Sequence, residues 1–145
     1  MGAKLILNPD LYNLDYPLGP ELPANLSKIH KMAETFLTIK EFKDKPITLI
    51  CKGQSGLIVA SILADKIPNA NIHFVRNPGD KHTTRGMTVP GRINVMTDDF
   101  IASGATMNDA WEQVGKPHIH CVLITADSRE GNLHFSPDYI VCREK

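Results

Sequence analysis

The sequence lacks a net charge, because its 16 lysines and arginines are balanced by 16 aspartates and glutamates. A broad basic surface that would attract nucleic acid or an anionic membrane is therefore not expected. Long apolar runs are also missing, and none approaches the ~18 consecutive residues that a membrane-spanning helix needs. The first residues, up to Pro9, lack the apolar stretch of a secretory signal. We therefore expect a cytoplasmic protein whose partners are neither nucleic acids nor membranes.

Cysteine is scarce, and aromatic residues make up only 6% of the chain. The three cysteines, Cys51, Cys121 and Cys142, are odd in number, and their spacing is not that of a metal site. Each lies in an apolar run, which predicts buried free thiols in a reducing compartment. The remaining composition, 42% hydrophobic over 145 residues, is that of one globular domain with one core.

Strand-like and helix-like segments alternate along the chain. The continuous apolar run at 47–51 predicts a buried strand. Four more strands are predicted at 71–75, 93–97, within 118–126, and at 139–142, and a further short strand is a candidate at 4–7. Helical periodicity predicts helices at about 26–37, 57–67 and 106–114. This order predicts an α/β fold: a Rossmann-like parallel sheet of about five strands with helices on both faces. Such sheets bind ligands beyond the carboxyl ends of their strands, at 52–56, 76–92 and 98–106 here.

The third of the five predicted strands is followed by Asp98 and Asp99, and then by a turn of small residues that opens a helix. The turn is Ala102-Ser103-Gly104-Ala105-Thr106. Small residues let backbone N–H groups approach an anion, and the helix adds the positive end of its dipole. The turn therefore suits a phosphate monoester, and the carboxylates suit sugar hydroxyls. The simpler alternative is an ordinary helix start capped by Asp and Ser.

Residues 93–107 resemble the phosphoribosyl pyrophosphate (PRPP) signature of type I phosphoribosyltransferases, with Asp98, Asp99, Gly104 and Thr106 where that family has them. The resemblance implies the type I fold in a single domain, 1–145, with a short hood (1–24) on a core (25–145). It also implies that Asp98 and Asp99 bind the ribose 2′- and 3′-hydroxyls. The turn at 102–106 would then hold the 5′-phosphate.

The segment Lys52-Gly53-Gln54-Ser55 follows the first of the five predicted strands. The family has a pyrophosphate-binding loop at this point, so the resemblance assigns these residues and Arg76 to pyrophosphate. A strained cis peptide bond between Lys52 and Gly53 would fit that pattern. An ordinary strand-to-helix turn with a serine cap is the alternative.

A long polar loop follows Arg76 and contains Lys81, His82 and Arg85. The family has a flexible lid here that closes over the reacting centre, which implies catalytic roles for these three residues. Orotate phosphoribosyltransferases carry a second basic residue where this chain has Asn77, and its absence favours a non-catalytic sensor over an enzyme. The alternative is a solvated connection whose charges have no role.

The resemblance implies an enzyme that transfers ribose 5-phosphate from PRPP to a nitrogenous base and releases pyrophosphate. Its catalytic residues would be Asp98, Asp99, Lys81, His82 and Arg85. Its partners would be PRPP and a nucleobase or nucleoside monophosphate, and a homodimer is compatible with the pattern. Mg²⁺ would be the cofactor, held mainly through the ligand, with Asp98 or Asp99 as the protein groups able to bind it. The alternative is a non-catalytic domain of the same fold that senses PRPP or a nucleotide.

His118 and His120 are two residues apart in a predicted strand and would share one face of it. No third ligand is evident from the sequence. They are therefore expected to be core or surface histidines rather than metal ligands.

Overall fold

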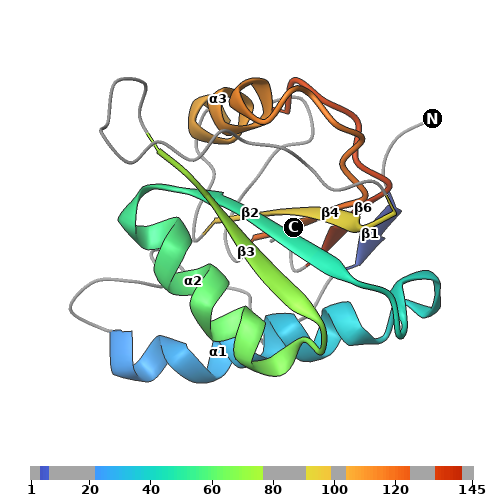
Figure 1. Ribbon diagram of the computed structural model, residues 1–145. Helices are drawn as coiled ribbons and strands as arrows, with labels where there is room; N and C mark the ends of the chain where they lie inside the picture. The colour runs from blue at the N-terminus through green and yellow to red at the C-terminus, as the bar shows by residue number, and fades with distance from the viewer. Residues whose placement is uncertain (1–3, 7–21, 77–90, 99–103, 125–132, 142–145) are drawn as a thin grey trace.

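The computed structural model describes residues 4–6, 22–76, 91–98, 104–124 and 133–141 (Figure 1). Its six strands are β1 Lys4–Ile6, β2 Ile47–Lys52, β3 Ala70–Val75, β4 Ile93–Thr97, β5 Cys121–Leu123 and β6 Tyr139–Val141. Its helices are α1 Leu22–Leu37, the 3-10 turn η2 Lys40–Phe42, α2 Gly53–Lys66 and α3 Ala105–Gln113. The strands form one sheet in the order β1-β6-β5-β4-β2-β3, and every pair is parallel. The predicted parallel α/β sheet is confirmed, with the short candidate strand near the start as its sixth member.

Helices cover both faces of the sheet, as the apolar runs predict. Figure 1 shows α1 and α2 on one face and α3 on the other. On β2, Leu49 and Cys51 belong to the cluster under α1 and α2, whereas Ile50 belongs to the cluster under α3. Successive strand residues point to opposite faces, so an unbroken apolar run supplies both layers at once.

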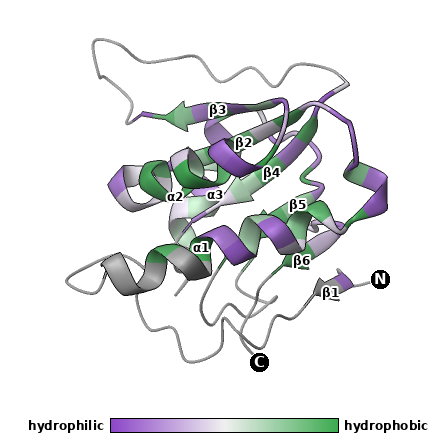
Figure 2. Cartoon of the chain, turned by 90° about the horizontal axis from the view of Figure 1, so that it is seen from below, coloured by the Kyte–Doolittle hydropathy of each residue, from purple (hydrophilic) through white to green (hydrophobic). Residues whose placement is uncertain are grey.

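The hydropathy of α1 follows this layering. The coloured part of the helix contains both hydrophilic and hydrophobic residues (Figure 2). Its apolar positions Ile29, Met32, Ala33 and Phe36 follow the i, i+3, i+4, i+7 pattern of one helix face, and all are buried. The helix begins at Leu22 rather than near Leu26, because a proline in the first turn, Pro23, is tolerated where no backbone donor is needed. The last part of the expected hood therefore belongs to α1, and 1–3 and 7–21 lie outside the described residues.

The turn between β2 and α2 is much tighter than predicted. Lys52 is extended, with φ −141° and ψ 144°, and Gly53 has φ +82°, so the chain reverses within one residue. Glycine takes this left-handed conformation without a Cβ penalty. The helix therefore starts at Gly53 and not at Leu57, and the expected loop at 52–56 is its first turn. The Lys52–Gly53 peptide bond is trans, so the expectation of a cis bond there is wrong.

Two of the three cysteines are buried free thiols, as predicted. Cys51 and Cys121 are buried and unbridged, whereas Cys142 lies outside the described residues. Burial raises the pKa of Cys51 to about 12, and the negative charge of Asp98 contributes to the rise. This cysteine is therefore a neutral thiol at physiological pH. None of the helices in the described ranges is long and apolar enough to cross a membrane.

Candidate functional site

The candidate site lies at the carboxyl ends of the neighbouring strands β2 and β4. Their register pairs Ile50 with Met96, so Lys52 and Asp98, each two residues further along its strand, leave the sheet side by side. The backbone N–H of Asp98 donates to the carbonyl of Leu123 over 3.2 Å, which fixes the Asp98 backbone to β5 as well. The sheet itself therefore holds the first acidic residue at its carboxyl edge.

Gly56 lets the first turn of α2 come close to that acidic residue. A Cβ at Gly56 would lie 3.7 Å from an Asp98 carboxylate oxygen, 3.7 Å from the Thr97 carbonyl oxygen and 3.4 Å from the Cys51 Cβ. Alanine would just fit, whereas a branched side chain would collide with the strand ends. The start of α2 and the Asp98 carboxylate therefore lie close together.

Two helix N-termini open at this edge, one after β2 and one after β4. Within the described residues, neither α2 nor α3 has a side-chain hydrogen bond at its N-cap or an acidic residue in its first turn. The N-cap of α3 is Gly104, which is left-handed with φ 78°. The first-turn N–H groups of a helix have no intrahelical acceptor, and its dipole is positive there. The pair therefore provides two places suited to anions.

The expected 5′-phosphate turn is described in part. Gly104 is buried, whereas Ala105 and Thr106 are exposed in the first turn of α3. Ala102 and Ser103 lie outside the described residues. So do Asp99 and three residues expected to be catalytic: Lys81, His82 and Arg85.

The expected pyrophosphate residues are brought together around the start of α2. Gly53 and Gln54 are exposed in its first turn, and Ser55 is half-buried beside them. Arg76 follows β3, whose Val75 pairs with Lys52, so Arg76 leaves the sheet next to Gly53. Its guanidinium carbon lies 5.9 Å from the centre of the Phe74 ring.

Lys52 has a partner that the sequence does not reveal. Its ammonium forms an ion pair with the Asp109 carboxylate of α3, and the Gln113 side-chain N–H donates to the same carboxylate over 2.9 Å. The Lys52 side chain is only 15% exposed, whereas that of Asp109 is 48% exposed. Asp109 and Gln113 share a helix face four residues apart, but only the fold shows that Lys52 lies opposite. Lys52 thus ties β2 to α3 and would have to share its charge with any anion bound at this edge.

Comparison with solved structures identifies the architecture. The HGPRT-ase from Leishmania tarentolae, solved in complex with GMP, is 18% identical, covering 81% of this chain and 76% of its own, with a TM-score of 0.51. The chain has the type I phosphoribosyltransferase fold. Other phosphoribosyltransferases show the same kind of likeness. The hypoxanthine-guanine enzyme from Schistosoma mansoni, in complex with IMP, is 15% identical, and the match covers 95% of this chain and 81% of that enzyme with a TM-score of 0.48. The purine enzyme from Pyrococcus horikoshii is 23% identical, and the match covers 79% of each chain with a TM-score of 0.47.

Neither the protein-family models nor the curated protein sequences give a match to this chain. The strand order nevertheless brings the predicted site segments to one edge of the sheet. The acidic pair follows β4, and the predicted pyrophosphate residues follow β2 and β3, which lie side by side in the sheet.

Two features at the opposite, amino-terminal edge were missed from the sequence. The Arg92 guanidinium donates to the Thr48 hydroxyl over 2.8 Å and to the carbonyls of Ile47 and Asn69. These hydrogen bonds link the starts of β2, β3 and β4. No local pattern marks that arginine, because its partners are 23 to 45 residues away. The second feature is Asp138, whose carboxylate lies beside His118.

Proposed function

We propose that this chain transfers the ribose 5-phosphate group of PRPP to a nitrogenous base and releases pyrophosphate. The observation that carries the proposal is the convergence of two helix N-termini on the sheet edge where Asp98 lies. PRPP carries a phosphate at one end of the ribose and a pyrophosphate at the other. Two helix starts suited to anions and a carboxylate at the same sheet edge match that charge pattern. The sequence signature at 93–107 supports the same assignment.

Each proposed role follows from this arrangement. Asp98 and Asp99 accept hydrogen bonds from the ribose hydroxyls, and the start of α3 holds the 5′-phosphate. The start of α2 and Lys52 hold the pyrophosphate. The bond from ribose C1 to the pyrophosphate oxygen breaks, a bond from C1 to a base nitrogen forms, and the proton of that nitrogen is released. The protein contributes by fixing this geometry and stabilising the departing charge.

A divalent cation fits the same proposal. Mg²⁺ prefers oxygen ligands and usually keeps water and substrate phosphates in its shell, with one or two carboxylates from the protein. The Asp98 carboxylate at the open edge is a donor of that kind. Bound Mg²⁺ would neutralise charge on the pyrophosphate oxygens.

The test of catalysis is single-turnover release of pyrophosphate from PRPP and Mg²⁺ across a panel of purine and pyrimidine bases. We expect one class of base to support release. We expect Lys81→Ala and Arg85→Ala each to slow release by about 100-fold while changing the dissociation constant of PRPP much less. The reason is that a lid charge acts mainly on the leaving group as its negative charge grows.

The second candidate is a non-catalytic sensor of PRPP or a nucleotide, and Asn77 favours it. Asn77 stands where orotate phosphoribosyltransferases have a second basic residue, so the segment after Arg76 has less positive charge with which to stabilise pyrophosphate. If PRPP binds but no base in the panel supports release, the transferase proposal fails and the sensor takes its place.

Gly104 allows a test of the phosphate position that separates folding from binding. Asparagine tolerates the left-handed conformation of Gly104, so Gly104→Asn should lose less folding free energy than Gly104→Val, whose backbone penalty alone is about 1–2 kcal/mol. Either side chain would crowd an anion at the start of α3, so we expect both variants to bind PRPP at least ~10-fold more weakly. Calorimetry gives the affinity, and urea denaturation gives the stability. A stable Gly104→Asn protein with unchanged affinity would place the phosphate elsewhere.

A further inference from the structure

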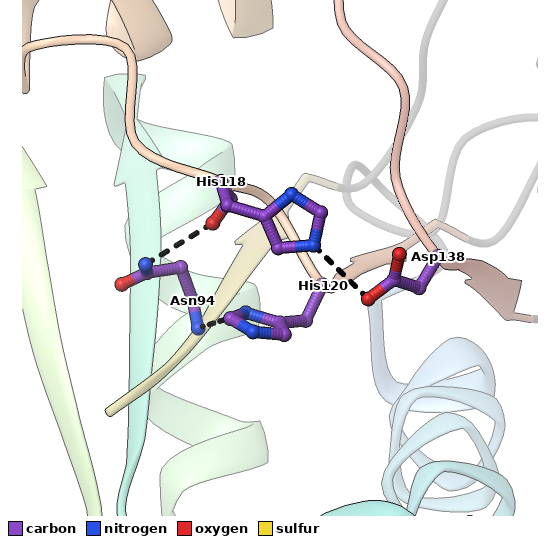
Figure 3. Close-up of polar contacts among 4 residues, drawn as sticks. All are labelled: Asn94, His118, His120 and Asp138. Atoms are coloured by element: carbon purple, nitrogen blue, oxygen red, sulfur yellow. Dashed lines mark hydrogen bonds and ion pairs between the residues drawn. The ribbon is translucent and has the colours of Figure 1, made fainter. Parts of the chain in front are cut away.

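A cluster of metal-ligating side chains lies at the opposite edge of the sheet from the proposed ligand site. His118 and His120 are in the extended segment that leads into β5, and Asp138 directly precedes β6, the next strand. Figure 3 shows the three side chains gathered between the two strand starts. A ring nitrogen from each histidine and a carboxylate oxygen of Asp138 lie within 4.8 Å of one another. Nε2 of His118 and Oδ2 of Asp138 are 3.1 Å apart.

The backbone under this cluster is held by the sheet. The N–H of Tyr139 donates to the His120 carbonyl over 2.9 Å, and the N–H of His120 donates to the Asn94 carbonyl over 3.0 Å. The N–H of Lys4 donates to the Asp138 carbonyl over 3.0 Å, so β1 fixes the third residue. The cluster therefore sits on paired backbone, and an ion binding there would not have to order a loop.

The side chains are packed against each other yet open to solvent. The two imidazole rings contact each other edge to face, with 4.6 Å between their centres. The side chains of His118 and Asp138 are 57% and 47% exposed. His120 and Asp138 also line a cavity of about 580 Å³. An ion can thus reach the cluster without opening the core.

We propose that His118, His120 and Asp138 bind a transition-metal ion of the Zn²⁺ class. Two imidazoles and one carboxylate form a donor set that suits Zn²⁺ and its neighbours, whereas Mg²⁺ and Ca²⁺ prefer oxygen ligands alone. Three protein ligands leave a fourth position for water. The ion would join the starts of β5 and β6 and would be separate from the Mg²⁺ expected with PRPP.

One hydrogen bond gives this site a specific signature. The buried N–H of Asn94 donates to Nδ1 of His120 over 3.1 Å (Figure 3), so the neutral ring carries its proton on Nε2. A metal ion on Nδ1 would take the lone pair that accepts this bond. A metal ion on Nε2 would displace the proton to Nδ1, which then could not accept. In both cases Asn94 loses its acceptor, so metal binding must change the environment of that amide.

Charged groups of both signs lie around the cavity. Burial lowers the pKa of His120 most, and the neighbouring His118 and then Lys45, which lines the same cavity, lower it further. The carboxylate of Asp138 acts in the opposite direction. Lys45 opposes a bound cation, and Asp138 favours it.

The test is calorimetric titration with Zn²⁺ of the full chain and of three variants. We expect one Zn²⁺ per chain, at least ~10-fold weaker binding by His118→Gln and Asp138→Asn, and unchanged binding by His134→Gln. His134 is the matched control, because it is exposed and lies outside the cluster. Both ligand positions are exposed, so these variants should fold.

The second measurement is the amide resonance of Asn94 during the same titration. We expect it to shift with the occupancy of the site in the wild type and to stay unchanged in His118→Gln at the Zn²⁺ concentration that saturates the wild type. Equal affinity in all four proteins, no binding by the wild type, or an Asn94 resonance that does not respond would each overturn the proposal. The outcome does not depend on whether the opposite edge binds PRPP.

Discussion

Replacing Asp98 and Asp99 together by asparagine should weaken PRPP binding by about 100-fold or more. Asparagine preserves size and shape, so the fold should be retained. Each carboxylate that accepts hydrogen bonds from a ribose hydroxyl contributes about 1.5–3 kcal/mol, and the loss of two amounts to about 3–6 kcal/mol. That range corresponds to roughly two to four powers of ten in the dissociation constant. Calorimetry with PRPP and Mg²⁺ measures the effect directly.

Asp65→Asn is the matched control, because Asp65 is exposed near the far end of α2. It should bind PRPP like the wild type. Cys51 provides an internal check on the position of Asp98, whose charge helps to raise the pKa of the thiol to about 12. In Asp98→Asn that contribution is lost, so the thiol should ionise at a lower pH. Equal PRPP affinity in the double variant and the wild type would remove the ribose role from the acidic pair.

Phe36→Ala should lower the free energy of unfolding by about 3–5 kcal/mol. Phe36 is 1% exposed on the inner face of α1, and its ring stacks on that of Phe42 with 5.4 Å between centres. Phe42 in turn meets the Tyr139 ring edge to face at 5.3 Å. Removing the first ring leaves a cavity that α1, η2 and β6 cannot all move to fill, because the sheet fixes one wall.

Urea denaturation measures this loss, and the next residue along supplies the control. Leu37 is 44% exposed, so Leu37→Ala should cost less than ~1 kcal/mol. Similar losses in the two variants would mean that α1 does not pack through the Phe36 face.

The centre of the sheet could be predicted because its strands β2 and β4 are buried, whereas the edge strand β3 is partly exposed. Ile47–Lys52 is buried up to its last residue and Ile93–Thr97 is buried throughout, and most residues of both strands are apolar. The start of α2 could not be predicted, because the chain turns from strand to helix at one left-handed residue, Gly53, and the expected loop is absent. Hydropathy gives the type of an element more reliably than its ends.

The candidate site divides in a similar way. The acidic pair and the small-residue turn are contiguous, so their chemistry is visible in the sequence alone. The partners of Lys52 and His118 are not, because Asp109 and Asp138 lie 57 and 20 residues further along the chain. The strand order decides which strand starts and which helix faces lie next to each other. The periodicity of a segment gives no information on its neighbours in space.

The pairing of β1 with β6 also constrains the order in which the molecule assembles. Lys4–Ile6 pairs only with Tyr139–Val141, so among the described strands the first in sequence must wait for the last. Closing so long a loop costs more entropy than closing the short connections between β2 and its neighbours, and that cost is repaid only once β6 has joined β5. The core from β2 to β5 can therefore form first, with β1 added as the final strand. During synthesis, β1 is made before the other described strands and would be the last of them to join the sheet.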